Sequence, residues 1–360
     1  MTSRTRVTRA LRGQPVDKLV WAPLVDDYYL YSLRHIGVEY DVSGCCAALG
    51  ADVIYRHANC LAWRFSGGVE RTERRDSNVV WRTTHTPVGN LTMAEEYLNG
   101  TSRILEHAVK TREEIKIMQY ITEHTYISAA YDDFLAADAD VGDRGIATVT
   151  VCATPLSNLF EFTIGLENFV YFLADYPDEM AALMDAMHES NKKQMRIAAQ
   201  SPAMAIFSYE DTSSTTISRK MYKNHCQAQL NDYADICAAE GKLYFVHMCG
   251  KLQAFNDMIA EGRMTGIDSC CPPNTGDIWP WEAVEKFSGA GGNKIIIGGI
   301  DPTFLCMASS TDLEAQLRVT IPKIKEAGRV ILSTGDATAA GTPMENIRLV
   351  SRLVDELGRY

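Results

Sequence analysis

The sequence has no long hydrophobic run. No stretch of the 360 residues is apolar over the length that a membrane-spanning helix requires. Residues 1–18 also lack the apolar core of a secretory signal peptide, so we expect a cytoplasmic protein with no membrane partner. In that compartment the ten cysteines are expected to be thiols or metal ligands rather than disulfides.

Positive charge is also scarce. The chain has 35 Lys and Arg against 46 Asp and Glu, which gives a formal net charge of −11. A surface of that sign repels phosphate, so no nucleic-acid partner is expected. The sequence also lacks internal repeats, linkers and low-complexity tracts, which indicates a single domain over residues 1–360.

Short β-rich runs alternate with helical patterns along the chain. Most of the eight strand candidates are apolar without polar alternation, which is typical of parallel strands buried on both faces. They are Leu19–Leu24, Asp52–Arg56, Ile146–Cys152, Ala203–Tyr209, Lys242–His247, Thr265–Ser269, Lys294–Ile300 and Val330–Ser333. Helical patterns lie at Leu166–Tyr176, Asp178–Ala199, Ser218–Ala239, Leu252–Ala260 and Thr311–Ala327. This alternation predicts an α/β fold of the (β/α)8 TIM-barrel type.

Two further features refine the predicted architecture. Residues 67–98 alternate around Val79–Trp81 and have turn residues near Asp76–Asn78, which indicates a β-hairpin insertion after the second strand. We expect this insertion near the barrel mouth. The alternative architecture is an open doubly wound sheet, but the Gly-rich phosphate loop typical of that fold does not follow the first strand.

The strongest local pattern is His247-Met-Cys249-Gly250, at the end of the strand Lys242–His247. Residues two apart on a strand point to the same side, so His247 and Cys249 converge at the carboxyl end of the strand, where barrel enzymes have their sites. Imidazole and thiolate suit zinc, and a catalytic zinc usually has three protein ligands and one open position. The alternative interpretation is a buried His and a buried Cys without a metal.

A third ligand has to come from another strand end, because loops after different barrel strands meet over the same mouth. Asp336 follows the eighth strand, and a carboxylate is an acceptable zinc ligand. Its alternative role is a turn or helix cap. Glu210 and Asp211 follow the fourth strand and are candidate catalytic acids, with a solvated loop pair as the alternative.

Polar residues also follow the first two strands. Asp26, Asp27 and Tyr28 come after the first strand and are candidate substrate-binding residues. His57 follows the second strand, where it is a candidate for orienting a substrate or holding a proton. The alternative for His57 is a hydrogen-bonded structural histidine.

Four segments resemble the uroporphyrinogen decarboxylase superfamily, and the resemblance extends over nearly the whole chain. They are Thr5–Gly13, Gly50–Ile54, Gly298–Pro302 and Gly341–Ile347. The resemblance implies a (β/α)8 barrel. The metal-free decarboxylases of this superfamily have arginines after the first strand and an aspartate after the second. Here no arginine follows the first strand before Arg34, and the aspartate position is His57, so the chain departs from the decarboxylase pattern.

The other branch of the superfamily comprises methyltransferases that work with a corrinoid protein. Their zinc motif is His-x-Cys-Gly with a late cysteine; it resembles His247–Gly250, and Asp336 stands at the position of the late cysteine. Some demethylating members are thought to bind zinc through two acidic residues and a histidine at wide spacing. At that spacing this chain has Asp211, Cys226 and His247, so Cys226 is an alternative ligand that ranks behind Asp336.

The resemblance therefore implies a zinc-dependent methyltransferase of a corrinoid system. It would transfer a methyl group from a small methylated donor, such as a methyl ether, to the cobalt of a corrinoid protein. Glu210 or Asp211 would donate a proton to the leaving group or orient the substrate. Two alternatives stay open: a methylcobamide:thiol methyltransferase that runs in the reverse direction, and a metal-free porphyrinogen decarboxylase-like enzyme. The expected partner is the protein that carries the corrinoid, and a homodimer is compatible with the sequence.

Overall fold

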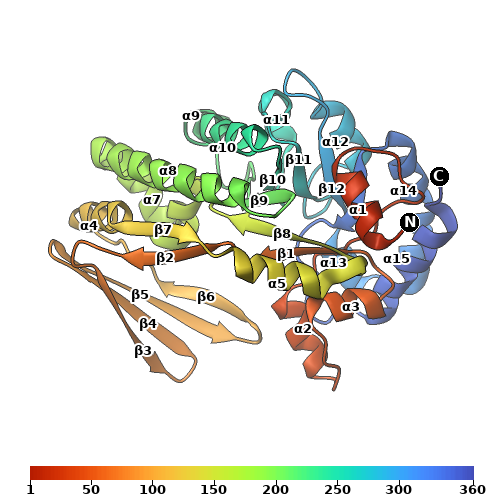
Figure 1. The fold of residues 1–360 in the computed structure, drawn as a ribbon, viewed down its shortest axis with the longest axis horizontal. Coiled ribbons are helices and arrows are strands. Elements are labelled where there is room, and N and C mark those ends of the chain that lie inside the picture. The colour runs from red at the N-terminus through yellow and green to blue at the C-terminus, as the bar shows by residue number, and fades with distance from the viewer.

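Seven parallel strands form the central sheet of the protein, which we describe from a computed structural model of residues 1–360 (Figure 1). Neighbouring strands follow one another in chain order, and every neighbouring pair is parallel. The strands are β1 (Val53–Ala58), β8 (Gly145–Val151), β9 (Ala205–Tyr209), β10 (Leu243–His247), β11 (Gly266–Cys270), β12 (Ile295–Ile300) and β13 (Val330–Thr334). The predicted strands match these bounds to within two residues.

The predicted first strand, Leu19–Leu24, closes the circle between β13 and β1. The Ala22 N–H donates to Leu332 O in β13 over 2.9 Å. On the other side, Trp21 O accepts over 2.8 Å from the N–H of the residue that precedes β1. The segment forms one bridge, Trp21 to Leu332, rather than a regular strand, because Pro23 has no N–H to donate. These bonds complete the predicted TIM-barrel-like fold.

Helices cover the outside of the barrel (Figure 1). They are α1 (Ser3–Leu11), α2 (Asp27–Arg34), α3 (Val42–Ala48), α4 (Arg112–Glu123), α5 (Tyr131–Val141), α6 (Pro155–Asn158), α7 (Leu166–Asp175), α8 (Pro177–Gln200), α9 (Arg219–His225), α10 (Gln227–Ala239), α11 (Asn256–Glu261), α12 (Pro280–Lys286), α13 (Pro302–Met307), α14 (Ser310–Ala327) and α15 (Met344–Leu357). Short 3-10 turns lie at Gly142–Arg144 and Gln253–Phe255, and a π-helical turn lies at Leu159–Thr163.

Two predicted helices differ from the observed ones in detail. The predicted helix Ser218–Ala239 is interrupted at Cys226, which lies between α9 and α10. The predicted helix Leu252–Ala260 begins as the 3-10 turn and continues as α11. The helix predicted at Thr311–Ala327 is α14, whose Ser309 cap accepts from the backbone N–H of Asp312. Local periodicity therefore located the helices but not the breaks within them.

Apolar side chains fill the amino-terminal end of the barrel interior. The rings of Phe207 and Phe245 stack there with their centres 5.1 Å apart. Val7 and Leu11 of α1 belong to the same cluster and cover this end. A larger apolar core lies between the strands and the outer helices. Because one end of the interior is filled, the polar residues that could act on a ligand gather at the carboxyl end.

The insertion after the second barrel strand is larger than the expected hairpin. It is a four-stranded antiparallel sheet of β3 (Glu70–Asp76), β4 (Val79–Thr86), β5 (Gly89–Leu98) and β6 (Thr101–Glu106). The sheet therefore extends past residue 98. The turn between β5 and β6 is Asn99–Gly100, where both φ angles are positive, 55° and 79°, as a two-residue hairpin turn requires. This Asn-Gly pair was the sequence signal for the additional hairpin.

An antiparallel pair of strands flanks the insertion in the chain. It consists of β2 (Leu61–Phe65) and β7 (Thr125–Ala129), and it lies between the barrel and the four-stranded sheet in Figure 1.

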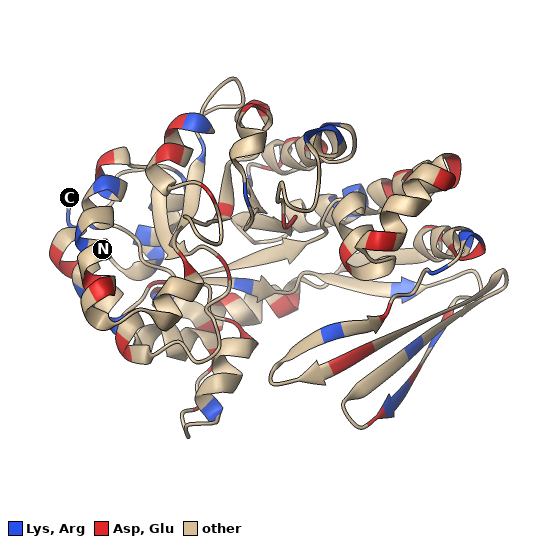
Figure 2. Ribbon diagram, turned by 180° about the vertical axis from the view of Figure 1, so that it is seen from behind, with Lys and Arg blue, Asp and Glu red and all other residues tan.

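Basic and acidic residues are interspersed over the helices and the insertion (Figure 2). All ten cysteines are free thiols. No helix of the chain combines the length and the apolar character needed to cross a membrane.

The first residue of β8, Gly145, provides a test of the tight packing between barrel strands. A Cβ atom at Gly145 would lie 1.9 Å from the backbone oxygen of Val53 in β1. Because paired backbone cannot move aside, we expect Gly145→Ala to lower the free energy of unfolding by about 1–3 kcal/mol, the usual range for overpacking. Urea denaturation measures this change. At Gly289 the nearest atom to an added Cβ is a side-chain carbon at 3.3 Å, so Gly289→Ala should change little, and equal losses would contradict the steric explanation.

Candidate metal centre

Polar side chains from neighbouring strands meet at the carboxyl end of the barrel. His247 is the last residue of β10, and Cys249 follows it by two positions. Asp211 lies two residues past β9, and Asp336 lies two residues past β13. The pairing of β10 with β11 puts Asp268 opposite His247. The strand-end rule of barrels therefore brings residues from four strands into one place.

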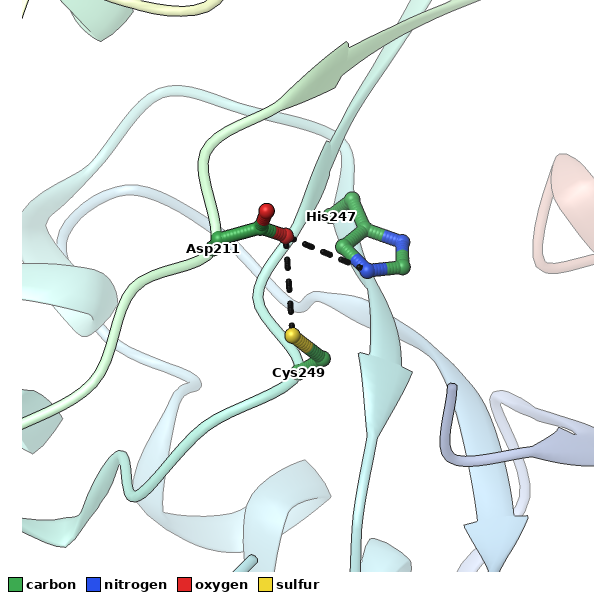
Figure 3. Close-up of side chains that lie close together, drawn as sticks. All are labelled: Asp211, His247 and Cys249. Carbon is green, nitrogen blue, oxygen red and sulfur yellow. Dashed lines mark hydrogen bonds and ion pairs between the residues drawn. The ribbon is translucent and has the colours of Figure 1, made fainter. Parts of the chain in front are cut away.

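The predicted pair His247 and Cys249 converges, and Asp211 completes a group of three (Figure 3). Asp211 Oδ1 lies 3.5 Å from His247 Nε2 and 3.5 Å from Cys249 Sγ. The ligand atoms of the three residues all lie within 4.8 Å of one another. Asp336 Oδ1 lies 3.6 Å from the same Nε2. Asp336 is therefore a further oxygen donor beside the group.

Two residues of this site have a strained backbone. The φ angle is 42° at Asp211 and 64° at Ser269, a left-handed conformation that residues with a Cβ rarely adopt. The other non-glycine residues with positive φ, Ser77, Asn99 and Arg329, lie in turns between regular elements. Strain of this kind persists only where the surrounding structure fixes the residue, and it is frequent at functional sites.

The imidazole of His247 is held on its far side by hydrogen bonds. Its Nδ1 lies 3.0 Å from Asp268 Oδ2 and 3.0 Å from Ser269 Oγ. Burial lowers the pKa of His247, but hydrogen bonds to Asp268 and Asp336 outweigh burial and raise the pKa well above its ordinary value. These acidic neighbours favour the protonated imidazole, and a cation that binds at Nε2 replaces the proton there.

The three donors fit a zinc ion. Burial raises the pKa of the Cys249 thiol to about 11, although His247 acts in the opposite direction, so this thiol becomes a ligand when a cation displaces its proton. Zinc bonds of about 2.0–2.3 Å in a tetrahedron separate the ligand atoms by about 3.3–3.6 Å. Asp211 Oδ1 lies 3.5 Å from both His247 Nε2 and Cys249 Sγ, which falls in this range, as does the 3.6 Å between His247 Nε2 and the neighbouring Asp336 Oδ1. A nitrogen, a sulfur and one or two carboxylate oxygens form a donor set typical of zinc.

Glu161 is a residue of this site that the sequence did not reveal. It lies on the π-helical turn Leu159–Thr163, next to Asp211. Burial, together with the negative charge of Asp211, raises the pKa of Glu161 to about 8. Single π-helical turns occur frequently at functional sites. The sequence offers only a weak signal for Glu161, an acid within an otherwise apolar run.

Glu210 and Cys226 lie together, outside the group around His247. Glu210 is 1% exposed and accepts hydrogen bonds from the Thr154 backbone N–H at 2.8 Å and from Ser157 Oγ at 2.7 Å. Burial raises the pKa of Glu210 to about 7, although these hydrogen bonds act against the increase. Cys226 Sγ lies 3.8 Å from Thr154 Oγ1. A catalytic role for Glu210 and a ligand role for Cys226 stay predictions.

The remaining predicted residues lie at the first two strand ends. Asp26 is the N-cap of α2, where its carboxylate accepts from the Tyr29 N–H over 3.0 Å. Asp27 and Tyr28 are exposed on the first turn of α2. His57 is exposed near the end of β1. Asp26 therefore has a structural role as a cap, and the roles of all four residues in substrate binding or proton transfer stay predictions.

Comparisons with known proteins agree with the barrel architecture. A family model described as uroporphyrinogen decarboxylase (URO-D) matches residues 144–357. No curated protein shows a significant match to the chain. Among solved structures, a methyltransferase from Methanosarcina mazei is 14% identical, with a TM-score of 0.62 over 99% of this chain and 99% of that chain. This similarity shows a shared fold.

Two other solved structures are less similar. A D-psicose 3-epimerase from Clostridium cellulolyticum H10, solved with D-tagatose, is 12% identical over 63% of this chain and 83% of that chain, with a TM-score of 0.37. A Bacteroidetes-affiliated GH5 cellulase is 10% identical over 73% of this chain and 87% of that chain, with a TM-score of 0.38. Scores this low support no argument about fold or activity.

The geometry predicts which carboxylate is the third ligand. Asp211 lies 3.5 Å from both His247 and Cys249, whereas Asp336 lies 3.6 Å from His247. We expect Asp211→Asn to lower zinc affinity by more than about 100-fold, because it removes a ligand, and Asp336→Asn by about 10-fold, the lower end of the range for groups that support the ligands. Competition with a chromophoric chelator measures both values. A larger loss for Asp336→Asn would make Asp336 the third ligand, as the sequence suggested.

The raised pKa of Glu161 predicts a pH-dependent stability of the metal-free protein. The folded pKa of about 8 exceeds the ordinary glutamate value of 4.5, so the folded chain holds more protons between these values. Stability from this proton is complete below about pH 4.5 and is lost as the pH rises through about 8. With a chelator present, we expect Glu161→Gln to reduce the loss of stability over this range, measured by urea midpoints at several pH values.

The control for this measurement is Glu167→Gln, because Glu167 is exposed on α7. This variant should retain the pH profile of the unmodified protein. If Glu161→Gln had the same pH profile as the unmodified protein, Glu161 would not hold the proton.

Proposed function

This chain belongs to the uroporphyrinogen decarboxylase family, and on that basis we propose that it is the methyltransferase component of a corrinoid-dependent system. In this proposal the enzyme transfers a methyl group from a small methylated donor, such as a methyl ether, to the cobalt of a corrinoid. A partner protein carries the corrinoid, and zinc is the resident cofactor of the enzyme. The fold shared with a methyltransferase supports this choice within the family.

The observation that carries the proposal is the convergence of His247 Nε2, Cys249 Sγ and Asp211 Oδ1 within 4.8 Å at the barrel mouth. This group has the donors and the spacing of a zinc site. A decarboxylase that acts on an acidic porphyrinogen needs cationic groups, but this chain has Asp26 and Asp27 where the first strand ends. Electrostatic repulsion at that position disfavours a polyanionic substrate.

The residues around the ion have separable tasks. A bound zinc ion would supply Lewis acidity, which weakens the bond between a methyl group and the heteroatom that carries it. His247, Cys249 and Asp211 would hold the ion. Glu161, beside Asp211, has a pKa of about 8 and therefore holds a proton on its carboxyl group at neutral pH. In this proposal that proton passes to the leaving heteroatom of the methyl donor.

The donor set favours demethylation of a donor over methylation of a thiol. Thiolate ligands increase electron density at zinc, which favours activation of a bound thiol. Here Cys249 is the one sulfur of the group, and the oxygen of Asp211 is the third donor. A centre with fewer thiolates is a stronger Lewis acid, which suits the withdrawal of electrons from a methyl ether or amine. The reverse, thiol-dependent direction is the alternative outcome of the test below.

Exposed apolar side chains beside Glu161 support a protein partner. Leu166 and Val170 lie four residues apart on α7 and are 43% and 50% exposed, and Phe162, on the π-helical turn before the helix, is 50% exposed. Side chains four apart on a helix share a face, and contiguous exposed apolar surface is typical of protein–protein contacts. A corrinoid protein that docks on this face would bring its cofactor close to the turn that holds Glu161.

A spectroscopic assay tests the proposed reaction. The purified protein is mixed with a reduced corrinoid protein and candidate methyl donors, and the cobalt absorption spectrum is recorded with time. We expect methylation of cobalt without added thiol, and about one zinc ion per chain by metal analysis. Cys249→Ser should lose both zinc and turnover. Cys306→Ser should retain both, because the thiol of Cys306 lies near Ala340 O and not in the group of three.

Two outcomes would contradict this proposal. Loss of methyl from methylcobalt that depends on a thiol would indicate the reverse direction of transfer. Full activity of protein that contains no transition metal would exclude the zinc site as the catalytic centre and would favour a decarboxylase-like enzyme.

A further inference from the structure

A permanent positive charge lies inside the barrel, beneath the candidate metal centre. The guanidinium of Arg56, on β1, is 2% exposed. Its Cζ lies 5.7 Å from the centre of the Phe207 ring, which belongs to the apolar cluster at the other end of the interior. Arg56 therefore lies between the apolar filling and the polar mouth.

Arg56 has one carboxylate partner, and that partner is on the opposite side of the barrel. Arg56 Nη2 donates to Asp268 Oδ1 over 2.7 Å, and both side chains are 1% exposed. β1 and β11 are separated by three strands in the sheet, so this ion pair crosses the interior. The Nε and Nη1 atoms of Arg56 have no hydrogen-bond partner. An ion pair with unsatisfied donors is a poor source of stability compared with apolar packing.

The second oxygen of Asp268 connects this pair to the metal centre. Asp268 Oδ2 lies 3.0 Å from His247 Nδ1, and His247 Nε2 lies 3.5 Å from Asp211 Oδ1. An ionised carboxylate accepts the Nδ1 hydrogen and so leaves Nε2 free for a cation. A chain of three residues therefore runs from β1 to the candidate ligand.

We propose that Arg56 is a positioning residue that acts through Asp268 to hold His247 with Nε2 directed at the metal ion. Without the guanidinium, Asp268 Oδ1 loses its partner, and the carboxylate is no longer held in place beside His247. This change removes the acceptor that fixes the imidazole orientation and its tautomer. The inference rests on the proposed zinc site, and it assigns to Arg56 a role in metal affinity rather than contact with the substrate.

Zinc affinity, rather than turnover, provides the test. We expect Arg56→Gln to weaken zinc binding about 10–100-fold, the usual effect of losing a group behind a metal-binding histidine. The visible spectrum of the cobalt(II)-substituted protein should also change, because this spectrum reports the arrangement of the ligands. Arg56→Lys, which retains the charge, should restore part of the affinity.

A double variant shows whether Arg56 acts through Asp268. Asp268→Asn alone should weaken zinc binding, and adding Arg56→Gln to it should cause no further loss, because the route through the carboxylate is already broken. The double variant should also be more stable than Arg56→Gln alone, since it contains no unpaired buried charge. Losses of affinity that add in full would overturn the proposed route.

A second buried Arg–Asp pair provides the control for purely structural effects. Arg6 Nη1 donates to Asp52 Oδ1 over 3.0 Å, with the two side chains 10% and 5% exposed. Arg6→Gln should reduce stability but leave zinc affinity and the cobalt spectrum unchanged. If folded Arg56→Gln also retained its zinc affinity and cobalt spectrum, Arg56 would have only a structural role across the barrel, and the proposed positioning would be wrong. Absence of zinc binding by the unmodified protein would instead overturn the proposed function itself.

Discussion

The hydrogen bond between His247 Nδ1 and Asp268 is the interaction on which the site depends. It satisfies the inner nitrogen of a buried imidazole and so leaves the outer nitrogen for the cation. The parallel pairing of β10 with β11 puts the two residues opposite each other, so the backbone of the barrel wall sets their separation. The other donors need only reach this fixed nitrogen. Asp211 does so from a strained backbone position, and Cys249, two residues after His247, lies 3.5 Å from Asp211.

The barrel makes this arrangement possible by giving its two ends different environments. Phe207, Phe245 and α1 fill the amino-terminal end, so water and ligands enter only at the opposite end. The buried interior at the polar end has a lower effective dielectric constant than water, which strengthens each charge interaction within it. Closure through Leu19–Leu24 matters for the same reason, because β1, which carries Arg56, would otherwise be an edge strand of the sheet.

The sequence predicted the barrel and the pair His247–Cys249 because both follow from local periodicity. Unalternated apolar runs indicate buried parallel strands, and residues two apart share a side of a strand. The choice between Asp211 and Asp336 could not be made in the same way, since it depends on a loop whose residue at Asp211 has positive φ. Glu161 required knowledge of a π-helical turn, which has no reliable sequence signature. Asp268 and Arg56 were hidden for a related reason, because their pairing crosses the barrel between distant segments.

The balance of charge at the mouth explains why such a site favours a divalent cation. Asp211, Asp336, Glu161 and the thiol of Cys249 surround a single imidazole. Burial, reinforced by the neighbouring negative charges, raises the pKa values of Glu161 and Cys249. A doubly charged ion favours the ionised form of its ligands and replaces the proton of Cys249, so ion binding and proton release are coupled. Because the fold already holds Asp211 and His247 in place, these ligand side chains lose little conformational freedom when the ion binds.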